Sequence, residues 1–331
     1  MSNVETAPAA LRCGAAVDAG PEGGPDAEPH VEVLSARDVP LGGPRAMLVR
    51  RTLPQRARTL IGAWCFADHY GPVDATETGM TVPPHPHTGL QTVSWLFSGE
   101  IEHRDSLGTR ALIRPGEMNL MTGGHGIAHS EVSTPGTAVL HGVQLWVALP
   151  AEHRDAARDF QHHVPEPVRT GDAEIRVFLG SLAGSTSPVR TFTPLLGAEI
   201  TLAPGATLTL AVDTDFEHGL LVDSGDVRLA GTALKPAELG YVPCGTGTLT
   251  VANDSDAPAR TVLLGGPPFG EEIVMWWNFI GRSHEDIVRA REDWQVGSGR
   301  FGEVEGYPGD RLPAPALPNA VIRPRGNPPR P

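Results

Sequence analysis

Short apolar runs broken by turn-forming residues constrain this chain more than any other feature. Gly (39) and Pro (32) together make 71 of the 331 residues, a content that suits short strands joined by tight turns better than long helices. The strand-like runs, which are apolar or β-branched, span residues 90–97, 139–149, 174–180, 198–203, 206–212, 219–223, 226–230, 239–243, 247–252 and 260–265. We therefore expect an all-β fold with few short helices.

The strand-like runs fall into two sets, which indicates two tandem domains. The polar sequence PAEHRDAARDFQHHVPEP interrupts the strand pattern near residues 150–170. A chain of 331 residues also exceeds the usual length of a single domain. We place a first domain at residues 31–160 and a second at residues 161–300, each a sandwich or barrel of short antiparallel strands.

Neither terminus has the pattern of a domain core. Residues 1–30 are rich in Ala, Gly, Pro and acidic residues without any period, which predicts a disordered arm. Residues 301–331 form a Pro-rich tail, and repeated Pro keeps such a segment out of helices and central strands. Leu317, Val321 and Ile322 are the tail residues best suited to dock on a domain.

One helix is predicted near the end of the second domain. Ser283 followed three residues later by Asp286 resembles a capping box. Ile287, Ala290 and Trp294 then recur at helical spacing. We interpret this segment as a helix that packs on a domain through one apolar face.

Charge and cysteine content restrict the partners and the compartment. A formal net charge of -13 argues against direct binding to nucleic acid or to anionic membranes. Lys235 is the one lysine and no P-loop motif surrounds it. Cys13, Cys65 and Cys244 form no CxxC pair, which argues against a disulfide framework and a thiolate zinc site. Without a secretory signal or a long apolar run, we expect a cytoplasmic protein with no membrane contact.

Histidines are concentrated in the first domain, and two pairs stand out. Six of the 13 lie within residues 85–141, namely His85, His87, His103, His125, His129 and His141. Residues two apart on a strand point to the same face, so His85 and His87 present two imidazoles together. His129 and Glu131 present an imidazole and a carboxylate in the same way. Two such pairs on separate strands can converge on one ion, and this donor set suits Fe(II), Mn, Ni, Co or Cu(II).

The same segments resemble the pirin family of the cupin superfamily. The motifs that carry the resemblance are PHPHTGLQTVSWLFSGEIEHRDSLG, RPGEMNLMTGGHGIAHSE, HGVQLWV and GGPPFGEEIVMWWNFIGRSHEDIVRAREDW. The resemblance implies a bicupin, in which two jelly-roll β-barrels follow one another, with one metal, usually iron, in the first barrel. It places the family's metal ligands on His85, His87, His129 and Glu131. The second barrel, in which His218 stands alone, is then a degenerate cupin without a metal.

Four further residues are candidates for the surroundings of the metal. The general cupin pattern has Glu where this chain has Gln91, so the carboxylate ligand has to come from Glu131. Pirins commonly have Arg where this chain has His125, which we interpret as a pocket residue or as one that orients the ligands. His103 and His141 also fit family positions, and we favour a structural hydrogen-bonding role over a catalytic one for both.

The resemblance implies two classes of function. Several pirins resemble quercetin 2,3-dioxygenases, which implies an iron-dependent dioxygenase that uses O2 on a flavonol such as quercetin or a related phenolic compound. Glu131 is then the catalytic base for the substrate proton. The candidate pocket residues are Val93, Trp95, Phe97, Met118 and Met121. The alternative is a metal-dependent redox sensor or regulatory protein that binds transcription factors or metabolic enzymes without turnover. A non-redox zinc cupin, such as a sugar isomerase, is a weaker third option.

The expected cofactor is one mononuclear divalent metal, with Fe(II) favoured over Cu, Ni, Co, Mn and Zn. The expected partners are the phenolic or flavonoid substrate and O2, or a protein in the regulatory alternative, and we expect a monomer. Because the two tails bury little apolar surface, residues 1–30 and 312–331 are expected to be dispensable for metal binding.

Overall fold

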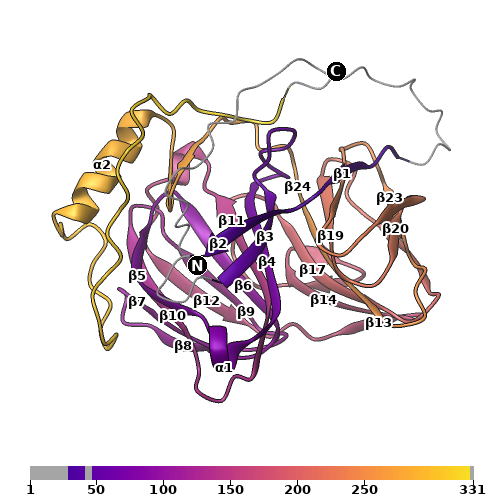
Figure 1. Cartoon of the computed structure of the whole chain (residues 1–331). Helices are drawn as coiled ribbons and strands as arrows, with labels where there is room; N and C mark the ends of the chain where they lie inside the picture. The colour runs from indigo at the N-terminus through magenta and orange to yellow at the C-terminus, as the bar shows by residue number, and fades with distance from the viewer. Residues whose placement is uncertain (1–28, 42–46, 329–331) are drawn as a thin grey trace.

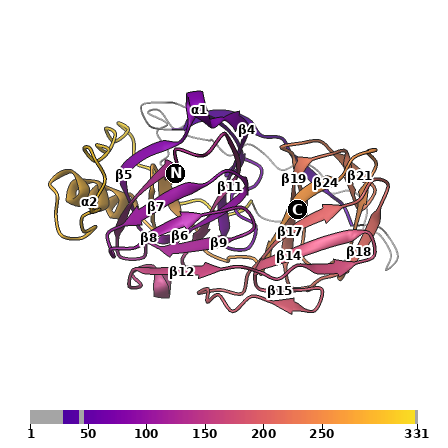
Figure 2. The same ribbon diagram turned by 90° about the horizontal axis from the view of Figure 1, so that it is seen from below.

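The computed structural model describes residues 29–41 and 47–328, which form two β units side by side (Figures 1 and 2). Each unit combines a seven-stranded sheet with a four-stranded sheet, and the strand pairs within these sheets are antiparallel. The prediction of an all-β fold with two tandem antiparallel units is therefore confirmed. The predicted arm lies outside the described residues except for residues 29–30, and Cys13 lies outside them as well.

The first unit contains the candidate metal ligands. Its seven-stranded sheet has the order β12 (Asp159–His163), β9 (Met118–Thr122), β6 (Leu90–Ser98), β11 (Val139–Ala148), β4 (Trp64–Asp74), β3 (Met47–Leu53) and β2 (Arg37–Leu41). Its four-stranded sheet has the order β5 (Thr81–His87), β10 (Ile127–Ser133), β7 (Ile101–Asp105) and β8 (Arg110–Ile113).

The second unit repeats this arrangement. Its seven-stranded sheet has the order β1 (Glu32–Leu34), β22 (Leu239–Val242), β19 (Glu217–Ser224), β24 (Ala259–Gly266), β17 (Leu196–Leu202), β14 (Ala173–Leu179) and β13 (Val168–Thr170). Its four-stranded sheet has the order β18 (Thr207–Ala211), β23 (Thr248–Asn253), β20 (Val227–Leu229) and β21 (Thr232–Leu234). Two small hairpins complete the strands, β15 (Ser181–Leu182) with β16 (Ser185–Thr186) and β25 (Val274–Trp276) with β26 (Phe279–Gly281).

Two strands belong to sheets that the sequence pattern did not indicate. β1 precedes every strand of the first unit, yet it pairs with β22 of the second. β12 lies within the polar interruption between the two sets of strands, yet it pairs with β9 at the edge of the first unit's sheet. Its side chains are mostly half-buried, which is the environment that polar residues tolerate in an edge strand.

The two seven-stranded sheets face each other across an apolar layer. This layer combines Trp64, Trp95 and Leu145 of the first unit with Phe178, Leu221 and Leu264 of the second. The indole Nε1 of Trp95 donates a 2.6 Å hydrogen bond across the layer to Glu199 Oε2. Because an apolar interface of this kind is buried on both sides, it fixes the position of one unit relative to the other.

The predicted helix is present as α2 (His284–Gln295), beside β5 on the outside of the first unit (Figure 1). Ser283 Oγ accepts from the Asp286 N–H and Asp286 accepts from the Ser283 N–H, which completes the capping box. Ile287, Ala290 and Trp294 are buried, as their spacing predicts. The other helical segments among residues 29–41 and 47–328 are α1 (Ala75–Thr78) and a 3₁₀ helix (Ala151–His153). None of the helices in the described part of the chain is long and apolar enough to cross a membrane.

The Pro-rich tail follows an extended path over the first unit (Figure 1). The Leu312 N–H donates a 2.8 Å hydrogen bond to the carbonyl of Pro84 in β5. Leu317 and Ile322 pack against the cluster that contains the buried face of α2, whereas Val321 is 70% exposed. The tail therefore buries more apolar surface than its sequence indicated, whereas its dispensability for metal binding stays a prediction.

Candidate metal centre

Strand β5 has a composition that fits the edge of a sheet. Three of its residues are proline, Pro83, Pro84 and Pro86. Proline lacks the N–H that an inner strand needs, so it is tolerated at an edge, and β5 is the edge strand of the four-stranded sheet. His85 and His87 are two residues apart on this extended backbone, which gives their rings a common face.

The rings of both histidines meet His129 of the neighbouring strand β10. His129 is the register partner of His85, and their ring centroids are 4.3 Å apart. His129 Nε2 lies 3.0 Å from His87 Nε2. One ring nitrogen from each of the three lies within 4.8 Å of the others, and all three side chains are buried. Trp146 of β11 packs edge-on against His87 at 5.3 Å, so the group lies between the two sheets of the first unit.

The orientation of His85 fits a metal ligand. Its Nδ1 lies 2.9 Å from the carbonyl of Pro83. Because a carbonyl only accepts, Nδ1 carries the proton and Nε2 keeps a lone pair. This Nε2 is buried and has no hydrogen-bond partner among the described residues, an unfavourable state that coordination would relieve.

The three rings are uncharged at neutral pH. Burial lowers the pKa of His85, His87 and His129 well below the usual 6.5, and the proximity of the other histidines lowers it further. The neutral imidazole is the form that binds metals. The residues present therefore fit a metal ion with nitrogen ligands.

Glu131 lies in an adjoining group of ligands. The register between β10 and β5 shifts between His129 and Glu131, whereas the pairing with β7 stays regular and places His103 opposite Glu131. His103, His129 and Glu131 each offer an atom within 4.8 Å of the other two. The four predicted ligands thus lie in one buried region as two overlapping groups that share His129.

Asp105 connects to these groups through His103. Its carboxylate accepts from the backbone N–H of Leu107 at 2.9 Å and of Thr109 at 3.1 Å, which fixes the turn after β7. It also accepts from His103 Nε2 at 3.1 Å. When His103 is uncharged, its Nδ1 is then an acceptor 3.3 Å from His129 Nδ1. This arrangement leaves the lone pair of His129 on Nε2, and partners of this kind orient metal-binding histidines.

Gln91 and His141 lie apart from the candidate ligands. Gln91 Nε2 donates to Thr122 Oγ1 at 3.0 Å. Ser94, whose hydroxyl is 3.5 Å from Glu131, is three residues further along β6, so Gln91 lies on the opposite face of that strand. His141 points toward the second unit, where a separate cluster, which the sequence pattern did not reveal, includes its side chain.

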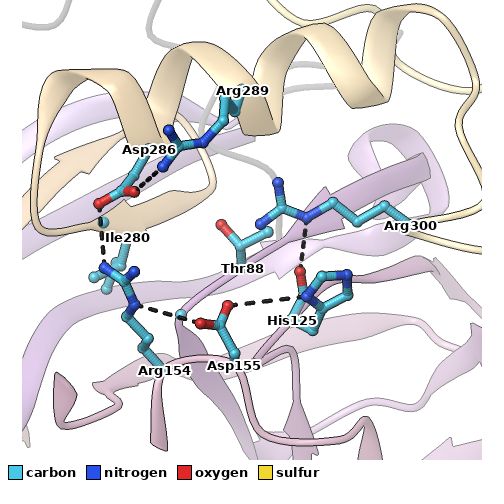
Figure 3. Close-up of a pocket in the computed structure, with 11 residues that line it drawn as sticks. Thr88, His125, Arg154, Asp155, Ile280, Asp286, Arg289 and Arg300 are labelled. Carbon is cyan, nitrogen blue, oxygen red and sulfur yellow. Dashed lines mark hydrogen bonds and ion pairs between the residues drawn. The ribbon is translucent and has the colours of Figure 1, made fainter. Parts of the chain in front are cut away.

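His125 lines a pocket of about 240 Å³ (Figure 3). Its side chain is 61% exposed, and it precedes the start of β10, so the regular alternation of that strand does not extend to it. Arg300 donates a 2.8 Å hydrogen bond to its carbonyl, and Arg154 and Arg289 line the same pocket. Thr88, which directly follows the ligand strand β5, is part of the wall.

The predicted apolar pocket residues belong mainly to packed layers. Val93, Trp95 and Met118 are buried in the layer between the two units, and Met121 is also buried. Phe97 is the exception, because it lines a second pocket between the units.

Comparison with known proteins agrees with this architecture. The Pirin family profile matches residues 46–147, and the profile of the Pirin C-terminal cupin domain matches residues 197–302. This chain belongs to the pirin family. A Pseudomonas aeruginosa protein, provisionally named quercetin 2,3-dioxygenase, is 45% identical over 298 residues, which cover 89% of this chain and 93% of the relative.

Two further relatives match over most of their length. A pirin-like protein of Caulobacter vibrioides is 35% identical and covers 86% of this chain, with 98% of its own length matched. The crystal structure of a quercetin 2,3-dioxygenase from Acinetobacter baumannii superposes with a TM-score of 0.84 at 36% identity, and the match covers 89% of this chain and 97% of that one. The two units of this pirin are thus cupin domains, and its histidine-rich centre implies a mononuclear metal.

Proposed function

We propose that this pirin is an iron-dependent dioxygenase that uses O2 on a flavonol such as quercetin or on a related phenolic compound. The observation that carries the proposal is the convergence of three buried, uncharged histidines on one point. His85, His87 and His129 would hold the metal, and Glu131 is the fourth candidate ligand. A bound redox-active metal would supply coordination positions for substrate and O2 and would lower the pKa of the substrate hydroxyl.

Glu131 is the residue that we assign to proton transfer. Its carboxylate is buried beside His129 and His103, where it would accept the proton of the flavonol 3-hydroxyl. Tyr70 does not compete for this role. Burial raises the pKa of Tyr70 well above 10, and the nearby charge of Glu131 raises it further, so that the phenol keeps its proton.

One observation favours the regulatory alternative. The histidines His85, His87 and His129 are fully buried, and they line neither the pocket of Figure 3 nor the pocket between the two cupin domains. In a regulatory pirin, the oxidation state of the iron would alter a surface that a transcription factor or a metabolic enzyme recognises. No substrate would then need a path to the metal.

The two functions are separated by an assay of turnover on protein purified without O2. The metal is measured by elemental analysis, and O2 uptake and carbon monoxide release are followed with quercetin and a panel of phenols. Iron with carbon monoxide release supports the dioxygenase, whereas iron without turnover across the panel supports the regulatory protein.

The ligand assignment is tested in the same preparation. The variant His87→Ala/His129→Ala should lose its iron at this centre while it keeps its β-sheet circular dichroism. His153→Ala, which removes a histidine that is 45% exposed, is the matched control and should keep its iron. An iron-to-protein ratio in the double variant equal to that of the wild type would overturn the assignment.

A further inference from the structure

A second group of metal-ligating side chains lies between the two cupin domains. His69 of β4 and His141 of β11 come from the first domain, and Asp223 of β19 comes from the second. The Nε2 atoms of His69 and His141 lie 2.7 Å and 2.6 Å from the same oxygen, Asp223 Oδ1. The two nitrogens are 3.4 Å apart. His69 and Asp223 are 1% exposed and His141 is 13% exposed.

We propose that His69, His141 and Asp223 form a second metal site, which binds a divalent transition metal such as Zn(II), Co(II) or Ni(II) across the domain interface. Two imidazoles and one carboxylate suit these ions. Ligand distances of about 2.0–2.2 Å in tetrahedral geometry separate neighbouring ligand atoms by about 3.4 Å. The two nitrogens already have this spacing, and the carboxylate oxygen has to withdraw by less than about 1 Å.

The charges around the cluster orient the carboxylate and limit the affinity. Arg260 lies 3.3 Å from Asp223 Oδ2, which leaves Oδ1 to face the two imidazoles, as partners of ligating carboxylates commonly do. Arg50 approaches His69 Nε2 to 3.5 Å, and its positive charge opposes a cation. We therefore expect this site to bind metal more weakly than the centre within the first domain.

The cluster adjoins a pocket that gives an ion access. The pocket between the domains has a volume of about 340 Å³ and is lined by Phe97 and Arg260, among other residues of both domains. Phe97 packs edge-on against His141 with ring centroids 4.9 Å apart, and Arg260 contacts Asp223. Three protein ligands leave a fourth position for water, so the pocket provides the solvent that such a site needs.

Hydrogen bonds alone could also explain these contacts. The number of metal ions bound per chain distinguishes this explanation from the metal site. Two uncharged imidazoles that each donate Nε2–H to Asp223 would hold the domains together by hydrogen bonds alone. Under the metal proposal, the full-length protein binds two equivalents of Co(II), whereas under the hydrogen-bond explanation it binds one. This proposal does not depend on the activity of the first centre.

The experiment uses the full chain after removal of metals, with Co(II) or Zn(II) added by equilibrium dialysis. The variant His87→Ala/His129→Ala should still bind one equivalent, with a visible Co(II) absorption band. Adding Asp223→Asn, which keeps the shape of the side chain, should lower the affinity for this remaining equivalent at least tenfold. Adding His141→Ala should abolish its binding. His162→Ala, which removes a histidine that is 43% exposed, should change nothing.

Two results would overturn the proposal. One is a wild-type protein that binds one equivalent together with a His87→Ala/His129→Ala protein that binds none. The other is a second equivalent that survives both Asp223→Asn and His141→Ala. Circular dichroism of each variant verifies that the domains remain folded, and Asp223→Asn keeps the test decisive if the alanine variant does not fold.

Discussion

At the scale of single residues, the charge of Glu131 is the property on which the proposed chemistry depends. Glu131→Gln keeps the size of the side chain and one ligating oxygen but removes the negative charge and most of the basicity. We expect metal affinity to fall moderately and turnover to fall by about 10²–10⁴-fold, as for the loss of a positioned general base. Carbon monoxide release at matched iron loading measures the effect. Equal turnover in the two proteins would refute the base role.

His103 offers a second test at this scale, because it acts through His129. Its Nδ1 lies 3.3 Å from His129 Nδ1, and the Oδ1 of an asparagine can take the place of this acceptor. We expect His103→Leu to lower metal affinity by about 10–100-fold, as for the loss of other residues that orient ligands. His103→Asn should retain most of the affinity. Competition with a chelator measures both, and equal losses in the two variants would show that the acceptor is irrelevant.

His218 links a single buried ring to the pH dependence of stability. Burial lowers its pKa to about 4, whereas in an unfolded chain it titrates near 6.5. Between pH 6.5 and about 4 the unfolded chain binds a proton that the folded chain does not. The free energy of unfolding therefore decreases as the pH falls through this range, by up to about 3 kcal/mol from this residue.

The matched variant is His218→Leu, which cannot titrate. Urea unfolding at pH 7 and at pH 4.5 should show a smaller loss of stability in the variant than in the wild type. The other buried histidines titrate in both proteins, so the difference isolates His218. Parallel losses in the two proteins would contradict the prediction.

At the scale of elements, helix α2 is held by its N-terminal cap as well as by its apolar face. Ser283→Ala removes the oxygen that accepts from the Asp286 N–H and should cost about 0.5–2 kcal/mol. Ser283→Asp restores an acceptor and should recover most of this loss. The midpoint of urea unfolding measures both, and an unchanged midpoint in Ser283→Ala would mean that the cap does not contribute.

The elements also show where sequence patterns were sufficient. The apolar runs at 90–97 and 139–149 predict strands, and the structure has β6 and β11 there. Both strands are mostly buried, which is why their sequences are apolar enough to be recognised. β12 could not be predicted in this way, because its half-buried polar residues have no apolar alternation. β1 has three residues, too few for any pattern, and its partner β22 lies some 200 residues later in the chain.

At the scale of the whole molecule, the candidate site was predictable only where ligands follow a local spacing. His85 with His87 and His129 with Glu131 are two-residue repeats on strands, so the sequence identified them. Asp223 has no such neighbour, and it meets its two histidines only because the seven-stranded sheets pack face to face. Contacts between domains depend on the packing of distant strands, which no local pattern encodes.

The path of the C-terminal tail also depends on contacts between residues that are far apart in the sequence. Trp294 Nε1 donates a 2.7 Å hydrogen bond to the Leu312 carbonyl, and Arg325 exchanges two backbone hydrogen bonds with Ile273. The Asn327 side chain accepts from the backbone N–H of Leu60 and donates to its carbonyl. The tail thus spans from α2 across to the loop before β4, and its removal would expose the apolar cluster beneath it.

A chain that ends at Arg311 should therefore be destabilised by about 2–4 kcal/mol, from the partly buried Leu312, Leu317 and Ile322. It should also lose metal more readily, because the Leu312 N–H no longer secures β5 at Pro84, which is one residue from His85 and three from His87. The matched control removes only residues 329–331. Urea unfolding and chelator-driven metal release measure the two effects. If the chain ending at Arg311 matched the control in stability and in the rate of metal release, the tail would contribute to neither. The local order of β5 would then come from its proline-rich sequence alone.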